Sequence, residues 1–149
     1  MLRTLLISTA LIVSSLAHAG ERGSAEEARA LLDRAIAHVK AVGKDKALAD
    51  FNDRDAGGYV DRDLYVFAWN QEPRAVAHGG NKAMIGRDMS KLKDADGRDL
   101  TRLIMDAGAK PQGDTIEYKW TDPISKKLEM KASYIVPYDG LIMGVGYYK

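Results

Sequence analysis

Three aspartates and one glycine lie close together in the stretch KDADGRD, residues 93–99, and oxygen-rich loops of this kind bind calcium. An EF-hand loop needs oxygen ligands at its first and twelfth positions and a glycine at its sixth. When Gly97 takes the sixth position, Leu92 and Leu103 fall on the first and twelfth, and neither side chain can bind a cation. We therefore expect no metal here. The stretch instead predicts a tight turn that leads to a helix capped near Asp99.

Lys131 lies in the middle of a predicted strand, EMKASY, where a lysine that points at a closed face is costly unless it is paired. An anionic ligand would be a suitable partner. The alternatives are a lysine on the solvent face or one paired with Asp or Glu. Strand alternation places Met130, Ala132 and Tyr134 on the face opposite to Lys131, and the residues alone favour these alternatives.

Aromatic side chains alternate along two other predicted strands. Tyr118 and Trp120 share one face of DTIEYKWT, where they suit the wall of an apolar pocket and the tyrosine hydroxyl can donate to a carboxylate. The same pair also suits plain core packing, and the two interpretations are compatible. Tyr65, Phe67 and Trp69 share one face of DLYVFAWN, but alternation does not say whether that face covers a helix or a ligand.

His78 ends a short predicted strand beside two glycines. In either protonation state its ring can hydrogen-bond to a ligand oxygen. A lone histidine at a strand end is more often a structural hydrogen-bond donor, so both interpretations stay open. His38, on the first predicted helix, is interpreted as a helix-surface residue.

Catalysis is not expected. The sequence contains no G-x-S-x-G motif, no H-E-x-x-H motif and no cysteine. Ser133 and His78 lack a third group that would orient the histidine as a catalytic triad requires. The absence of thiolates also argues against sulfur-ligated zinc, and we expect no cofactor.

The first segment, MLRTLLISTALIVSSLAHAG, has the features of a secretory signal peptide. Arg3 supplies a positive charge, residues 5–16 form a short apolar run, and the AHA motif at residues 17–19 fits a signal peptidase site. The run is shorter than the roughly 20 residues that span a bilayer, so cleavage is favoured over an uncleaved membrane anchor. We expect a signal peptide over residues 1–19 and one exported domain over residues 20–149.

The charge balance narrows the class of partner. Loss of Arg3 with the signal peptide leaves 21 basic and 21 acidic residues, and a formal charge of zero argues against nucleic acid or an anionic membrane. Without cysteine, the exported domain would rely on its core rather than on disulfides.

Periodicity predicts an α+β domain. Apolar residues recur at helical spacing over residues 24–42, behind a capping box formed by Ser24 and Glu27. The remaining predicted elements are a helix at 44–52, strands at 63–70 and 74–78, a helix at 98–109, and strands at 114–121, 127–136 and 141–148. This order predicts a five-stranded antiparallel sheet with helices packed on it.

Taken in order, DLYVFAWNQEPRAVAHGGNKAMIGRDMSKLKDADGRDL, IEYKWTDP and KLEMKASYIVPYDGLIMGVGYY resemble the single Cache sensor domain. This is the extracellular ligand-binding module of many bacterial chemoreceptors and sensor kinases, and the resemblance covers nearly all of the mature chain. It implies a PAS-like fold in which a long N-terminal helix lies behind the five-stranded sheet. The ligand would sit between the other sheet face and the connection HGGNKAMIG. Family members commonly bind small organic acids such as short-chain carboxylates.

The resemblance also implies roles for individual residues. Lys131 matches the family's carboxylate-binding position, and Tyr65 matches its strand tyrosine. His78 precedes the connection that forms the ligand lid, and Met84 would supply apolar contacts from that lid. The expected ligand site consists of Tyr65, His78, Met84, Tyr118, Trp120 and Lys131.

Chemoreceptors carry a second membrane helix and a signalling region after this domain, whereas this sequence ends at Lys149. We therefore expect a free-standing periplasmic or secreted domain that binds a small organic acid and acts through a membrane chemoreceptor or sensor kinase. A homodimer through the N-terminal helix is a further expectation. The alternative is an interaction protein that kept the Cache fold, has a lost or filled pocket, and acts on a membrane receptor or envelope partner. An open space around Lys131 would favour the first hypothesis, and a filled one the second.

Overall fold

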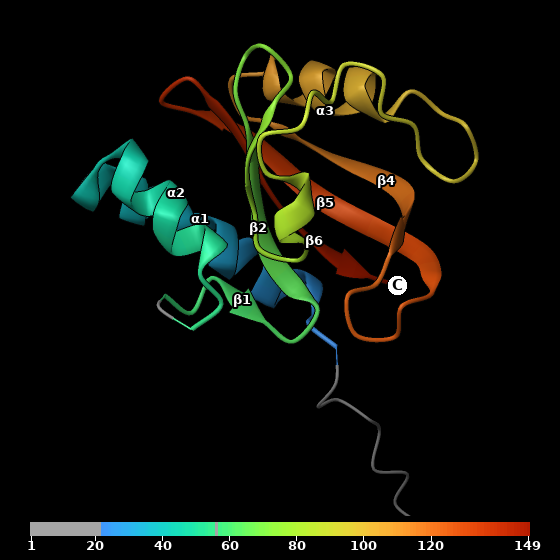
Figure 1. Cartoon of the computed structure of the whole chain (residues 1–149), viewed down its shortest axis with the longest axis horizontal. Coiled ribbons are helices and arrows are strands. Elements are labelled where there is room, and N and C mark those ends of the chain that lie inside the picture. The colour runs from blue at the N-terminus through green and yellow to red at the C-terminus, as the bar shows by residue number, and fades with distance from the viewer. Residues whose placement is uncertain (1–21, 56) are drawn as a thin grey trace, which may run out of the picture.

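The computed structural model describes residues 22–55 and 57–149, which form an antiparallel sheet with helices on its two faces (Figure 1). The signal-peptide prediction lies outside the described residues. The elements are α1 (Ala25–Val42), α2 (Lys44–Asn52), β1 (Val60–Asp61), β2 (Leu64–Trp69), β3 (Ala75–His78), the 3-10 helix η1 (Lys82–Met84), α3 (Leu100–Gly108), β4 (Asp114–Thr121), β5 (Leu128–Tyr138) and β6 (Leu141–Tyr148). Within the described ranges, no helix is both long and apolar enough to cross a bilayer.

The sheet has the strand order β1-β2-β6-β5-β4, and β3 pairs with β2 beyond the point where β1 ends. All five predicted strands are present, and the antiparallel arrangement confirms the predicted α+β class. The sequence does not predict β1, because two residues are too few to show an alternation. β1 pairs with the first two residues of β2 and so extends the sheet at that end.

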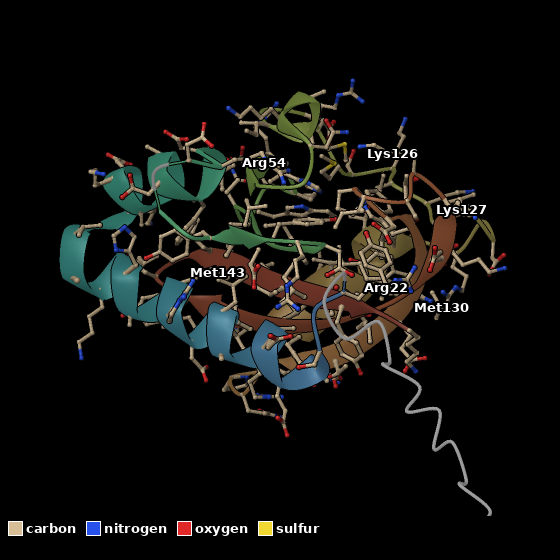
Figure 2. The ribbon with its side chains drawn as sticks, turned by 90° about the horizontal axis from the view of Figure 1, so that it is seen from below. Arg22, Arg54, Lys126, Lys127, Met130 and Met143 are labelled. Atoms are coloured by element: carbon tan, nitrogen blue, oxygen red, sulfur yellow. The ribbon has the colours of Figure 1, made fainter. Side chains whose placement is uncertain are left out.

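α1 and α2 cover one face of the sheet (Figure 1). α1 begins at the predicted capping box: the Ser24 hydroxyl accepts from the Glu27 amide at 3.1 Å, and the Glu27 carboxylate accepts from the Ser24 amide at 2.7 Å. Leu32 and Val39 of α1 belong to the same buried apolar cluster as Met143 of β6, which Figure 2 labels. Burial of this stripe fixes the helix on the sheet.

His38, predicted to lie on the helix surface, is only partly exposed. Its side chain is half-buried, and its Nε2 lies 2.8 Å from a carboxylate oxygen of Asp50 on α2. Its ring also packs beside Tyr59, with the two ring centroids 5.0 Å apart. Helical periodicity alone misses such a contact, because it depends on where the second helix returns.

The other face of the sheet is covered by α3 and by the connection between β3 and α3 (Figure 1). Tyr65, Phe67 and Trp69 of β2 are buried on this face together with Leu100 and Ile104 of α3. The alternating aromatic residues of β2 therefore face away from α1, which sequence alternation had left open.

The acidic stretch at residues 93–99 is the predicted tight turn. The Gly97 amide donates to the Asp94 carbonyl at 3.0 Å, and Gly97 adopts a φ of 80°, which glycine tolerates without strain. Arg98 donates to the buried Asp94 carboxylate at 2.7 Å. Asp99 then caps α3 by accepting from the Arg102 amide at 2.9 Å.

Candidate functional site

A small cavity lies between the sheet and α3, on the face away from α1. Its volume is about 20 Å³, which suits about one water molecule and no organic acid. The lining residues are Tyr65, Phe67, Trp69, His78, Met84, Leu92, Leu100, Ile104, Tyr118 and Trp120. The structure thus brings together five of the six predicted site residues, and Lys131 is not in the lining.

A larger cleft of about 570 Å³ opens outside this cavity. Tyr65, His78 and Trp120 line both spaces, so these three side chains stand between the cavity and the cleft. Lysines lie on the cleft wall, among them Lys119, whose ammonium is 2.9 Å from a carboxylate oxygen of Asp96. The route from solvent to the cavity therefore passes basic residues first and aromatic residues second.

Lys131 is completely buried, and its Nζ has no hydrogen-bond partner. The Nζ lies 3.8 Å from the centroid of the Tyr65 ring and 5.1 Å from that of Tyr148, so the two aromatic faces cover the ammonium. Burial lowers the pKa of Lys131 to about 7, although the nearby carboxylates of Asp63 and Asp122 favour the charged form. Lys131 has no exposed surface, and the Tyr65 ring that packs against its ammonium also lines the cavity.

His78 is buried at the end of β3 and is neutral at ordinary pH. Burial and then the Lys131 charge lower the pKa of His78 to about 3. Its Nδ1 accepts from the Asn81 amide at 3.0 Å, which places the proton of the neutral ring on Nε2. The His78 amide donates to the Asn52 side chain at 2.9 Å. One ring nitrogen is thus used structurally, and the other is a hydrogen-bond donor at the cavity wall.

Tyr118 and Trp120 form the β4 wall of the cavity, with their rings nearly perpendicular and 6.0 Å apart. The Tyr118 hydroxyl lies 3.0 Å from the Ser133 hydroxyl, and burial raises the pKa of Tyr118 to about 12. Because Ser133 pairs with Tyr118 and the Nδ1 of His78 pairs with a backbone amide, no serine–histidine pair forms here.

Met84 ends η1, the single helical turn in the connection that covers the cavity. The turn begins at Asn81, whose side chain accepts from the Ala83 amide at 3.0 Å. Gly80, just before this turn, packs so closely that an added Cβ would lie 2.6 Å from the Tyr65 ring. Gly80 therefore lets the connection close over the tyrosine.

The single Cache domain 2 family matches the sequence over residues 5–149. The chain belongs to this family. The PAS-like sheet and the helices that pack on it agree with this membership. A comparison with curated proteins found no significant match.

Solved structures of sensor domains share this Cache fold. A methyl-accepting chemotaxis protein from Vibrio parahaemolyticus RIMD 2210633 has a TM-score of 0.70 at 21% identity, with 83% of this chain and 86% of that chain covered. A Cache chemosensory domain studied for carboxylic acid recognition has a TM-score of 0.67 at 20% identity, covering 83% and 91%. A periplasmic sensor domain of a chemotaxis protein has a TM-score of 0.61 at 23% identity, covering 83% and 88%.

Two buried carboxylates whose charges raise the pKa of Lys131 were not predicted as site residues. Asp63 is completely buried in the turn between β1 and β2, and Asp122 is almost completely buried just after β4. Aspartate is common in turns, so the sequence gives no reason to assign either residue to a site. Only the three-dimensional structure places both acids near the lysine. Within residues 22–55 and 57–149, no group of three or more His, Asp or Glu side chains could hold a metal ion.

Proposed function

We propose that this Cache domain is an exported sensory module that binds a short-chain carboxylate. The observation that carries the proposal is the Lys131 ammonium, which is fully buried beside the aromatic cavity and has no hydrogen-bond partner. A buried unpaired cation is costly, and a small anion is the partner that would remove the cost.

The residues around the cavity have complementary roles in this proposal. Lys131 neutralises the carboxylate, and the Nε2–H of His78 donates a hydrogen bond to it. The hydroxyls of Tyr65 and Tyr118 are further donors near the anion. Trp120 and Met84 close the apolar end, where a short hydrocarbon tail would lie.

Binding in this scheme requires an opening of the site. The Tyr65 ring packs against the Lys131 ammonium and lines the cavity, Lys131 itself is not in the lining, and the cavity is too small for an acid. We expect the Tyr65 ring and the connection that carries Gly80 to move outward as the acid enters from the cleft. The acid recognition described for one Cache neighbour supports this ligand class.

A thermal-shift screen of acids with two to four carbons tests the proposal, because a ligand that binds only the folded state raises the melting temperature. Acetamide and propionamide are matched controls, since they have similar shape and no charge. We expect acids to raise the melting temperature and the amides to leave it unchanged. A screen in which no acid produces a shift contradicts the proposal.

Isothermal titration calorimetry of Lys131→Met then tests the assigned residue. Loss of the ammonium should abolish binding of the best acid, whereas Lys119→Met should bind it nearly as well as the native protein. Lys119 is a suitable control because it lines the cleft but already pairs with Asp96. Full-strength binding by Lys131→Met would remove Lys131 from the site.

A second candidate function is an interaction protein that acts on a membrane chemoreceptor or sensor kinase without binding a ligand. The filled space around Lys131 and the cavity of about 20 Å³ favour it. It predicts no thermal shift with any acid but retention of a receptor's extracellular domain on the immobilised protein. A homodimer through α1 fits either function, and analytical ultracentrifugation tests it.

We infer that the domain is not an enzyme. The Ser133 hydroxyl pairs with Tyr118 and the Nδ1 of His78 accepts from a backbone amide, so neither group activates the other. Incubation with ester and amide substrates should give no turnover above the rate in buffer.

A further inference from the structure

Two buried side-chain atoms lack a hydrogen-bond partner within the described part of the chain. One is Lys131 Nζ, and the other is Asp63 Oδ2. Their charges are opposite, and each carries a desolvation cost that the other would offset. One buried polar atom without a partner can be an accident of packing. A buried cation and a buried anion that both lack a partner indicate a common functional role.

Asp63 is held firmly by its other carboxylate oxygen. Oδ1 accepts from the Gly23 amide at 2.6 Å, at the segment that leads into α1. Asp63 comes directly after Arg62 in the sequence, and Arg62 adopts a φ of 56° in the tight turn between β1 and β2. The turn therefore fixes one oxygen on the backbone and leaves the second without a partner, and burial raises the pKa of Asp63.

Asp122 is the second acid near the lysine. Its Oδ1 accepts from the Ile124 amide at 2.7 Å, in the turn after β4, and its Oδ2 accepts from Arg22 at 3.3 Å. Figure 2 shows Arg22 at the same end of the molecule as Lys126 and Lys127 of the β4–β5 hairpin. Both acids are thus tied to residues 22 and 23.

The groups around the ammonium are divided between two sides. Tyr65 and His78 lie toward the cavity, which they line. Tyr148 of β6 covers the ammonium from the neighbouring strand, and Tyr118 of β4 is opposite Lys131 in the sheet register. The acids Asp63 and Asp122 line neither the cavity nor the cleft.

We propose that Asp63 and Asp122 are positioning residues whose negative charges favour the Lys131 ammonium behind the Tyr65 ring while the site is empty, although neither acid forms a hydrogen bond or salt bridge with it. An incoming carboxylate must then compete with these two charges for the ammonium. This inference rests on the proposed function for the ligand step, but the holding of the lysine is a property of the ligand-free protein. When the ligand carboxylate pairs with the ammonium, the nearby positive charge no longer compensates Asp63 and Asp122, which stay bound to residues 22 and 23. Ligand binding would then change the contacts of residues 22 and 23, which lead into α1.

The holding step is tested by NMR on ligand-free protein, with pH titration of the Lys131 ε-methylene signal. In the native protein we expect a midpoint near 7, from the lowered pKa of Lys131, and an upfield position, because the ammonium end lies over the Tyr65 ring. Asp63→Asn keeps an acceptor for the Gly23 amide but removes the charge. We expect this variant to lower the midpoint by about one pH unit, a tenfold change in proton affinity.

Asp61→Asn is the matched control, because Asp61 lies two residues away in the chain and pairs with Arg62 at the surface. It should leave the midpoint and the upfield shift unchanged. Asp122→Asn is the second test variant and keeps the acceptor for the Ile124 amide, so it serves if Asp63→Asn does not fold. Native midpoints and shifts in the folded test variants would overturn the proposal.

Addition of pyruvate, which stays ionised above pH 5, tests the capture step. We expect the Lys131 signal of the native protein to leave its upfield position and the Gly23 amide signal to shift with it. If the acid shifts the Lys131 signal but not the Gly23 amide signal, the proposed link to residues 22 and 23 is wrong. If no acid moves Lys131 while Asp63→Asn still lowers its midpoint, the proposed function fails and the holding of the lysine stands.

Discussion

The two faces of the sheet are built from different kinds of residue. On the α1 face, the buried cluster consists of aliphatic side chains with a few aromatic ones, from Leu31 and Leu32 to Val145. On the α3 face, aromatic side chains surround a cavity, and the buried set includes Lys131, His78 and Ser133. Buried polar groups lower stability unless they are paired. The first face therefore provides most of the stability, and the second gives up stability for a site that can bind an anion.

Leu32→Ala should give the largest effect and test the role of the α1 face. Leu32 is buried between α1 and the sheet, and removal of such a side chain costs about 2–5 kcal/mol of unfolding free energy. Urea unfolding measures this loss, and acid affinity at low temperature should be unchanged. Leu128→Ala is the control, because Leu128 is 61% exposed and should cost less than about 0.5 kcal/mol. A weaker affinity in folded Leu32→Ala would show that the two faces are not separate.

Lys131→Met should raise the free energy of unfolding, whereas Leu32→Ala should lower it. The methionine fills the same space without a buried charge, so we expect a gain of about 2–4 kcal/mol in unfolding free energy at pH 6. The full cost of lowering the lysine pKa would be somewhat larger, but loss of the cation leaves Asp63 uncompensated, which offsets part of the gain. A loss of stability at pH 6 would mean that the charges of Asp63 and Asp122 compensate the ammonium by more than its burial costs.

The pH dependence of this gain follows from linkage. The pKa of Lys131 falls from an ordinary value of 10.5 to about 7 on folding, so between these values the unfolded chain binds more protons than the folded domain. Native stability should therefore rise as the pH increases from about 7 to about 10, whereas Lys131→Met should lack this rise. The advantage of the variant over the native protein should fade across the same interval.

The difference between the faces also explains what the sequence could predict. Periodicity and capping located α1, the five longer strands and the turn before α3, because each depends on neighbours along the chain. Alternation correctly placed Lys131 opposite Tyr134 and grouped Tyr118 with Trp120. The Tyr65 ring over Lys131 and the buried Asp63 depend on packing between distant segments, which no local pattern encodes. The ligand-site residues themselves remain predictions that binding experiments must test.

Tyr118→Phe should give the next largest effect and probe a polar contact inside the α3 face. The variant leaves the buried Ser133 hydroxyl without its partner at 3.0 Å, which should cost about 1–3 kcal/mol. The double variant Tyr118→Phe/Ser133→Ala removes both groups and should recover part of that loss. Urea unfolding of both proteins measures the coupling. Equal stabilities for the single and double variants would show that the two hydroxyls do not depend on each other.

The smallest expected loss of stability comes from removing a helix cap, and each face of the sheet has one helix whose cap can be removed. Ser24→Ala removes the cap of α1 and Asp99→Ala removes the cap of α3, and each should cost about 1 kcal/mol. The consequences for binding should differ, because Leu100, the first residue of α3, lines the cavity, whereas no residue of α1 does. Fraying of the first turn of α3 should weaken acid binding several-fold in calorimetric titrations, and fraying of α1 should weaken it less, because the start of α1 is linked to the site only through residues 22 and 23. If both caps weaken binding equally at equal stability, then the α1 face takes part in recognition, and the division between a stabilising face and a binding face is wrong.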